Sequence, residues 1–247
     1  MIEWAKAGRG ILAEQKNLAP IERALLEAQV HTAELTGAAL LTPSVDSIYE
    51  ESFTPEKLQA EIEKQAKKYQ ELEFHKHKST KMSAGRLKDL VMGLIIPQPE
   101  TFTGRFGIPV VVFGQISPKD QAELLGLNYY LGGLKISDWP DDPRGYTTPV
   151  NPYMTWMQDG KKNLKKSVST VRANLQEDER GATIHDGIAL YIANPNVLKD
   201  HFIDLPGTKV ESDFAPDLYV WHDRPRLHYD RVGGAYPGFG AASCGRV

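Results

Sequence analysis

Cysteine is almost absent from this sequence, which has one such residue, Cys244, among 247. A single thiol cannot form a disulfide within the chain, which excludes a disulfide-stabilised scaffold and fits a reducing compartment. Long hydrophobic runs are also missing. The longest, residues 87–96, is too short and too charged to span a bilayer, and the first ten residues lack a signal-peptide core. We therefore expect a cytoplasmic protein without membrane association.

An excess of charge of either sign is missing as well. The chain has 29 Lys and Arg against 32 Asp and Glu, a formal net charge of −3. Such a balance gives no overall attraction to nucleic acid, so any contact would depend on a local patch. The densest basic patch is Lys161, Lys162, Lys165 and Lys166. It could contact phosphates, but no aromatic residue lies between the lysines to stack on bases, so we regard a nucleic-acid partner as unlikely.

Motifs for nucleotide binding and hydrolysis are absent too. The sequence contains neither G-x-G-x-x-G nor G-x-x-x-x-G-K-[ST], and neither H-E-x-x-H nor G-x-S-x-G. His75 and His77 have the spacing of two metal ligands, but no cysteine or carboxylate cluster nearby would complete the set. We predict no cofactor and no metal site.

The first part of the chain is predominantly helical in pattern. Pro20 opens one predicted helix and Pro55 opens another over residues 55–74, because proline suits the first helical position. The second helix has a narrow apolar stripe, made of Leu58, Ile62, Ala66, Tyr69 and Leu72. Such a stripe is typical of a surface helix, and the alternative is a helix that binds a protein partner or a second copy of the chain. A third helix ends before Pro97, so we assign residues 1–96 to a helical N-terminal region.

The pattern changes after a turn-rich stretch that begins at Pro97. A β-branched run at residues 108–113 predicts a buried strand, and residues 153–157 predict another. Together with the C-terminal elements, these predict an α+β protein. Its mixed domain, residues 97–247, is expected to hold a small, mainly antiparallel sheet.

A long loop at residues 139–149 carries three prolines, which exclude regular structure across it. Asp138, Asp141 and Asp142 could hold a hard cation, but their spacing fits no calcium-binding loop. We favour ordinary turn chemistry for these carboxylates.

The stretch from residue 183 onward has the clearest local signals. Thr183 and Asp186 have the spacing of a capping box at the start of a helix. Residues 217–222 and 226–229 are predicted to form a hairpin, with His222 on the same strand face as the apolar residues.

A glycine-rich tail begins at Gly233 and can bring bare backbone close to a partner. Tyr236 and Phe239 could anchor it on this domain or on another chain, and we count them with Arg246 as candidate binding residues. The alternative, which we favour, is that the tail closes over the hairpin and completes the core.

Several short motifs of this region occur together in a known family. In chain order they are Asp186-Gly-Ile-Ala-Leu190, Pro195 with Val197-Leu198, Leu205-Pro-Gly207, Pro216-Asp-Leu218, Pro225-Arg-Leu227 and Gly240-Ala-Ala-Ser-Cys-Gly-Arg246. In this order they resemble domain of unknown function 5701, a family of uncharacterised bacterial proteins, over residues 108–246. The resemblance implies a bacterial, cytosolic α+β protein and assigns no catalytic residue. Because relatives often lack the tail cysteine, it also argues against Cys244 as a nucleophile.

An enzyme that uses Cys244 is nevertheless the main functional alternative. It would need an ionised thiol beside His222 or His228, with a third group such as Asp230 to orient the histidine. The residues around Cys244 match no local cysteine-protease signature, and a cysteine near a chain end is poorly preorganised unless the end is tied down. The sequence therefore favours a cytosolic binding or accessory protein without catalytic activity.

Overall fold

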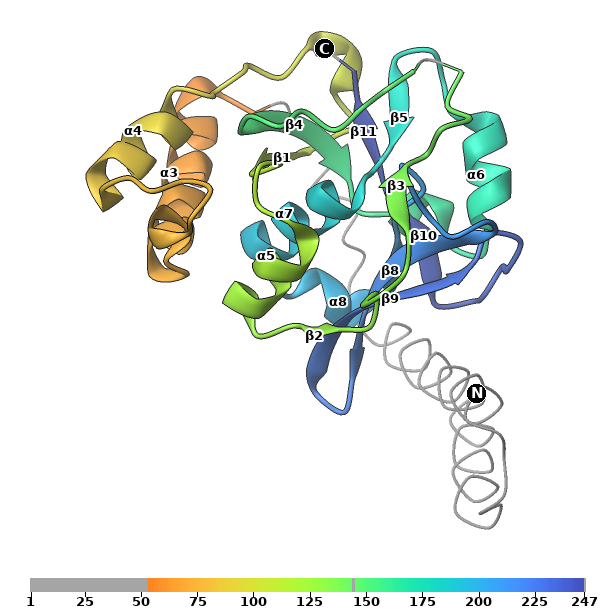
Figure 1. Cartoon of the computed structure of the whole chain (residues 1–247). Helices are drawn as coiled ribbons and strands as arrows, with labels where there is room; N and C mark the ends of the chain where they lie inside the picture. The colour runs from red at the N-terminus through yellow and green to blue at the C-terminus, as the bar shows by residue number, and fades with distance from the viewer. Residues whose placement is uncertain (1–52, 144, 247) are drawn as a thin grey trace.

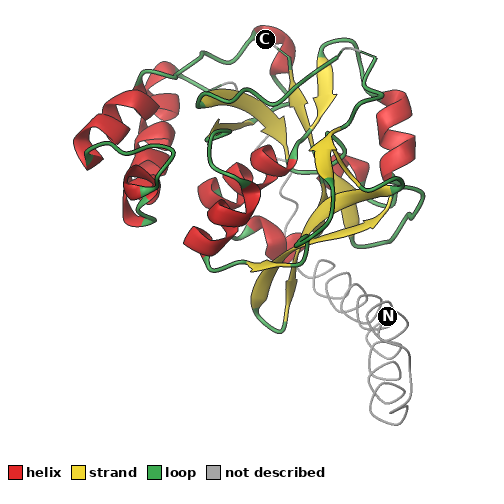
Figure 2. Ribbon diagram, in the orientation of Figure 1, coloured by secondary structure: helices red, strands yellow, loops and turns green. Residues whose placement is uncertain are grey.

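The computed structural model describes residues 53–143 and 145–246, which form an α+β fold as predicted (Figure 1). Two sheets occupy the middle of this part of the chain. Helices α3 (Pro55–Glu71) and α4 (Ala84–Met92) lie on one side of the sheets and α6 (Val168–Asn174) on the other (Figure 2). The other helices are α5 (Pro118–Leu125), α7 (Ile184–Ala193) and α8 (Val197–Asp200), with 3-10 turns at Phe74–Lys76, Glu100–Phe102 and Lys161–Asn163.

The first sheet has four strands, in the order β1 (Ile108–Val112), β4 (Tyr153–Gln158), β11 (Ser243–Gly245) and β5 (Glu179–Gly181). All of its ladders are antiparallel. Four of the five residues of β1 are buried, as its β-branched run predicts. Strand β11 lies between β4 and β5, so the last strand described is an interior strand of this sheet.

The second sheet has seven strands. Five follow the order β10 (Phe239–Ala241), β6 (Phe202–Asp204), β8 (Phe214–Trp221), β7 (Thr208–Val210) and β3 (Ile136–Asp138). The other two are β9 (Arg224–Arg231), which pairs with β8, and β2 (Asn128–Tyr129), which pairs with β9. The β10–β6 and β2–β9 ladders are parallel, and the others are antiparallel. The mainly antiparallel character is therefore confirmed, although the described residues form two sheets where one small sheet was expected.

The predicted hairpin is present as β8 and β9, but its turn lies earlier than expected. His222 and Asp223 form a two-residue turn and have positive φ values of 47° and 58°. His222 is therefore not on the apolar face of the strand, contrary to the prediction. The predicted connection between the two strands included Pro225. In the structure Pro225 lies inside β9, opposite Val220.

The C-terminal tail joins the two sheets. Strand β10 pairs with β6 in one sheet, and β11, one residue later, pairs with β4 and β5 in the other. The Phe239 ring is buried against Phe202, with ring centroids 4.8 Å apart. The favoured prediction that the tail completes the core is thus confirmed, and Phe239 faces the interior where a partner contact had been considered.

The apolar stripe of α3 is covered by the chain itself. Its residues Leu58, Ile62, Ala66 and Tyr69 are buried. On the same face, Gln65 Nε2 donates a hydrogen bond of 2.7 Å to the Pro109 carbonyl, and the Tyr69 hydroxyl donates to the Val111 carbonyl. These four side chains are therefore packed within the chain itself, while Leu72, the fifth residue of the predicted stripe, is half-buried at the end of the helix.

Helices α3, α4, α5, α7 and α8 share one hydrophobic core with the sheets. Phe53 packs edge-on against Trp156 at 5.3 Å, and the Trp156 indole donates to the Ile96 carbonyl at 3.1 Å. Within the described residues, elements on both sides of the expected domain boundary at residue 97 therefore pack in the same core. The helix predicted after Pro20 lies outside them. No helix in the described part has both the length and the hydrophobicity needed to cross a membrane.

Candidate functional site

The N-terminus of α7 is held by short polar contacts. The Thr183 hydroxyl accepts from the Asp186 amide at 3.3 Å, and the Asp186 carboxylate accepts from the Thr183 amide at 2.7 Å. This is the predicted capping box, with Asp in the place of Glu. The Ile184 amide donates to the Thr208 hydroxyl at 2.9 Å, which ties the start of α7 to β7.

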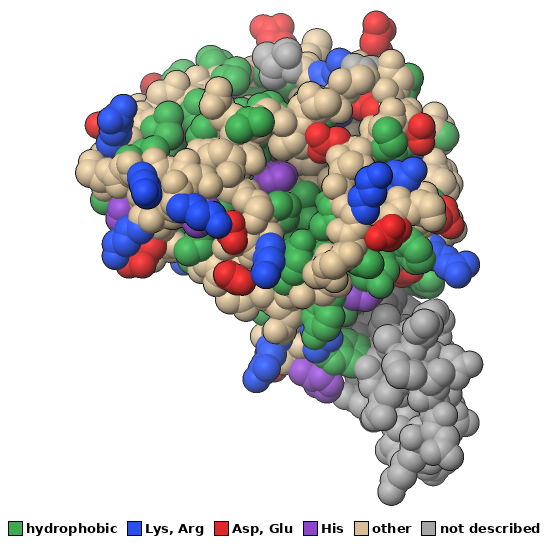
Figure 3. Space-filling model, viewed as in Figure 1, with side chains coloured by type: hydrophobic (Ala, Val, Ile, Leu, Met, Phe, Trp, Pro, Cys, Tyr) green, Lys and Arg blue, Asp and Glu red, His purple; other side chains and the backbone are tan. Residues whose placement is uncertain are grey.

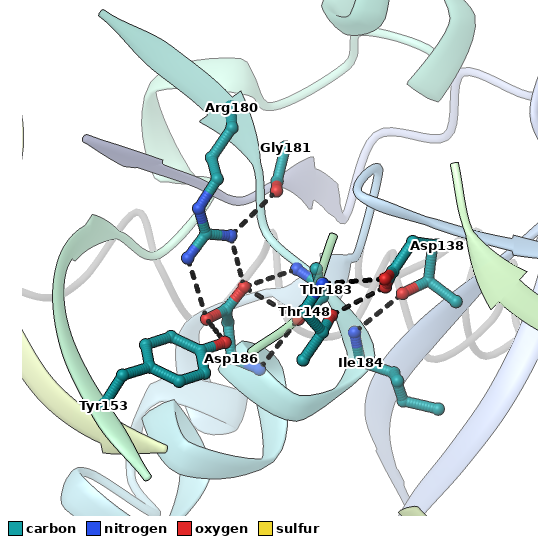
Figure 4. A network of polar contacts seen from close by, with 9 residues as sticks. Asp138, Thr148, Tyr153, Arg180, Gly181, Thr183, Ile184 and Asp186 are labelled. Atoms are coloured by element: carbon teal, nitrogen blue, oxygen red, sulfur yellow. Dashed lines mark hydrogen bonds and ion pairs between the residues drawn. The ribbon is translucent and has the colours of Figure 1, made fainter. Parts of the chain in front are cut away.

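A buried ion pair supports this helix end from one side (Figure 4). Arg180 donates through Nη1 to Asp186 Oδ2 at 2.5 Å and through Nη2 to Oδ1 at 3.1 Å. The Tyr153 hydroxyl also donates to Oδ1, at 2.9 Å. Burial opposes ionisation of Asp186, but Arg180 and the Thr183 hydrogen bonds outweigh it, so the pKa of Asp186 is lowered. The pair therefore stays charged and fixes where α7 begins.

On the other side of the helix end lies a cleft of about 250 Å³. It is bordered by α5 and α7 on one side and by β3 and β7 on the other, and is lined by Gly114, Pro118, Ile136, Ser137, Asp138, Thr148, Ile184, His185 and Thr208. In Figure 3, hydrophobic side chains gather in the middle of the face that is seen, and charged side chains lie on both sides of them. The cleft lining combines apolar side chains with fixed polar groups, as small-molecule pockets do, and the volume of the cleft lies just below the ~300–1,000 Å³ that is usual for them.

Asp138 is the one carboxylate of this cleft. Thr148 donates to it twice, from its amide to Oδ2 at 2.7 Å and from its hydroxyl to Oδ1 at 2.6 Å. The long proline-containing loop folds back to bring Thr148 to Asp138 (Figure 4), and both residues line the cleft together with Ile184 and His185. No cationic side chain in the described part of the chain is ion-paired with Asp138.

His185, on the first turn of α7, is the cleft's second titratable group. Its Nε2 lies 3.2 Å from the Ile116 carbonyl, which can only accept, so Nε2 carries the proton and Nδ1 is left as an acceptor. Nδ1 is buried and has no hydrogen-bond partner among the described residues. Burial lowers the pKa of His185, although Asp186, the Ile116 carbonyl and Asp138 act in the opposite direction. The imidazole is therefore neutral near pH 7.

The residues expected to form a cysteine-dependent site are separated. Cys244 lies on β11 in the four-stranded sheet and is fully buried, whereas His228 lies on β9 in the seven-stranded sheet and His222 lies in the turn before it. Burial raises the pKa of Cys244, and the nearby charge of Arg180 offsets this only in part. The thiol is thus protonated and enclosed, which is the opposite of what a nucleophile requires.

His228 and Asp230 belong instead to a row of polar groups across three strands. Asp204 lies opposite Asp217, and Asp217 lies opposite His228, whose Nδ1 is 3.4 Å from Asp217 Oδ2. Burial, together with the charges of Asp217 and Asp230, holds the pKa of Asp204 well above its usual range. No group of three or more His, Cys, Asp or Glu residues in the described ranges could hold a metal ion.

The lysine patch lies along a 3-10 turn and the segment after it. Lys162, Lys165 and Lys166 are exposed, and Lys161 is half-buried. The Lys162 ammonium donates to the Gly104 carbonyl, and that of Lys166 donates to Asn163 Oδ1 at 3.1 Å. The patch is thus partly engaged by the chain itself.

The two remaining candidate binding residues lie in different places. Tyr236 is half-buried, with its ring 5.5 Å from that of Phe239. Arg246 donates through its amide to the Asp178 carbonyl at 2.8 Å and borders an open depression together with Arg105 and Asp178. Neither residue lines the cleft at α7.

Comparison with known proteins gives no indication of the function. Scans of protein-family models, curated proteins and solved structures found no match to this chain. The function therefore has to be argued from the geometry of the cleft. Sequence reasoning considered Asp138 but missed Thr148 and His185 as its neighbours, because nothing local indicates that the loop returns to the start of α7.

Proposed function

We propose that this protein binds a small organic molecule in the cleft at the N-terminus of α7 and does not catalyse its conversion. The observation that carries the proposal is a cleft of about 250 Å³ in which Asp138 is held by two hydrogen bonds from Thr148. Polar groups that the fold holds in place, surrounded by apolar walls, are typical of binding sites for small ligands.

Two features support binding over catalysis. The only thiol of the chain, Cys244, is buried in the four-stranded sheet. The histidine of the cleft, His185, has its Nε2 proton engaged by the Ile116 carbonyl. A general base needs its free nitrogen within hydrogen-bond reach of the substrate, and the free nitrogen of His185, Nδ1, is buried within the protein.

The cellular setting belongs to the same proposal. The single cysteine and the C-terminal motifs support a cytosolic bacterial protein of the domain of unknown function 5701 type. Nucleic-acid contact through the lysine patch is less favoured, because two of its four ammonium groups donate to the chain itself.

The test is a screen of small fragments by thermal shift and ligand-detected NMR, with a variant that blocks the cleft. Ile136 is half-buried and its side chain lines the cleft, so Ile136→Trp should fill it. Ile95→Trp makes the same change at a half-buried isoleucine that does not line the cleft. We expect hits that bind wild type and Ile95→Trp but not Ile136→Trp. Hits that bind all three proteins equally would place the ligand elsewhere and overturn the proposal.

A further inference from the structure

We propose that the ligand of this cleft is a small organic cation, a primary amine with a short aliphatic body, whose ammonium group binds Asp138. The inference rests on the proposed binding function and adds the chemical class of the ligand. It is carried by the arrangement of charge and hydrogen-bonding groups around Asp138.

Asp138 still has hydrogen-bonding capacity directed at the cleft. An ionised carboxylate can accept about four hydrogen bonds. Thr148 fills one site on each oxygen and so fixes the orientation of the carboxylate. No described Lys, Arg or His balances its charge, and Asp138 lines the cleft. An ammonium group, with three donors and a positive charge, complements such a half-filled carboxylate.

The other groups at the cleft do not oppose a cation. His185 is uncharged near pH 7, because Nε2 donates to Ile116 and burial disfavours a second proton. The Arg180 charge is compensated by Asp186 in a buried pair. Asp138 is therefore the uncompensated charge among the residues that line the cleft.

The positive end of the α7 dipole would by itself favour an anion. Two of the first amides of α7 are already satisfied, however. The Ile184 amide donates to the Thr208 hydroxyl and the Asp186 amide to the Thr183 hydroxyl. An anion would have to compete with these bonds and would also face the charge of Asp138.

The walls of the cleft set the size and polarity of the rest of the ligand. Ile136, Ile184 and Pro118 supply apolar surface. A volume of about 250 Å³ is several times the ~30 Å³ that one water molecule occupies in the liquid. The cleft therefore suits a chain of a few carbon atoms attached to the ammonium group.

The experiment compares three probes of nearly equal size and different charge: butylamine, butanol and butyrate. Binding to the full chain is followed by protein-observed NMR at low and high salt. Butylamine should bind about tenfold or more tightly than butanol, because its hydrogen bonds to Asp138 are charge-assisted. High salt should weaken butylamine and leave butanol unchanged. Butyrate should bind most weakly.

Asp138→Asn removes the charge and keeps one carbonyl acceptor for Thr148, so it should bring the affinity of butylamine down to that of butanol. Asp141→Asn, at an exposed carboxylate in the loop that follows β3, is the matched control and should retain the preference. Should the Asp138→Asn variant not fold, the salt dependence in wild type gives an independent answer.

The outcomes separate the two proposals. A preference for butyrate, or equal binding of all three probes at the cleft, overturns the cationic ligand while the binding function stands. A fragment screen without any hit in the cleft overturns the binding function itself.

Discussion

Cys244 lies directly opposite Arg180 in the ladder between β11 and β5, and both side chains are buried. Arg180 in turn pairs with Asp186 on α7, and its guanidinium carbon lies 4.0 Å from the centre of the Tyr146 ring. The C-terminal strand therefore packs beside the ion pair that fixes the start of α7. The cysteine is part of the support of the cleft, and it does not act within it.

Arg180→Met should destabilise the protein strongly. It leaves the Asp186 carboxylate buried without its cation, and breaking a buried pair in this way typically costs about 3–5 kcal/mol. Arg105→Met is the control, because the Arg105–Asp178 pair is more than one-third exposed at each side chain and such pairs contribute about 0–1 kcal/mol. Urea unfolding measures the loss of stability in both variants. Equal losses in the two variants would show that the buried pair does not support the fold.

Cys244 should not react with a thiol reagent while the protein is folded. Its side chain is fully buried and burial raises its pKa, so little thiolate is present and none is accessible. Incubation with Ellman's reagent at pH 8 should label no thiol in native buffer and one equivalent in denaturing urea. Rapid stoichiometric labelling of the native protein would restore the possibility of a reactive cysteine.

Asp204 should make the protein less stable as the pH rises. Its pKa is raised in the folded state by burial and by Asp217 and Asp230, so the folded protein keeps a proton that the unfolded chain loses above the usual pKa of aspartate. The unfolded state then binds fewer protons, and the free energy of unfolding falls with increasing pH. Asp204→Asn removes this contribution, so its stability relative to wild type should increase from pH 4 to pH 8.

Urea midpoints across this pH range measure the effect of the Asp204 substitution. Asp213→Asn, at an exposed carboxylate, is the control for the general effect of removing one negative charge. A difference between Asp204→Asn and wild type that stays constant with pH would contradict the assignment of a retained proton to Asp204.

Gly160→Ala should be destabilising by about 2 kcal/mol or more. A Cβ atom at this position would lie 2.2 Å from the Gly240 carbonyl oxygen, and the backbone has a φ of +98°. Gly85→Ala is the contrasting change, because nothing lies within 4 Å of a Cβ in α4, where alanine should stabilise by up to about 1 kcal/mol. Thermal unfolding of both variants tests the contact. A neutral Gly160→Ala would mean that the tail is not packed against residue 160.

The parts of the fold that could be predicted are those set by local chemistry. Thr54 and Pro55 mark the start of α3, and Thr183 with Asp186 mark the start of α7, because each cap depends on residues within one turn. The strand β1 was visible from its β-branched run. The hairpin turn was misplaced because His222 and Asp223 adopt positive φ, which is uncommon without glycine, although His and Asp are among the residues that adopt it most readily.

The candidate site could not be assembled in the same way. Asp138 ends a strand, Thr148 lies near the end of an irregular loop, and His185 belongs to a helix of another region. Their proximity depends on how β3 pairs with β7 and how α7 packs, which are contacts between distant parts of the sequence. The position of β11 within the four-stranded sheet is non-local in the same sense, since Ser243 pairs with Gln158 and Gly181.

The placement of β11 has a consequence for synthesis of the chain. Strands β4 and β5 both pair with β11 and not with each other, and both are translated long before residues 243–245. A nascent chain therefore carries open edges on β4 and β5, of the kind that promotes aggregation, until residues 243–245 have been made and can pair with both strands. The four-stranded sheet must assemble after that point, and its open edges are the surfaces that a chaperone would have to shield until then.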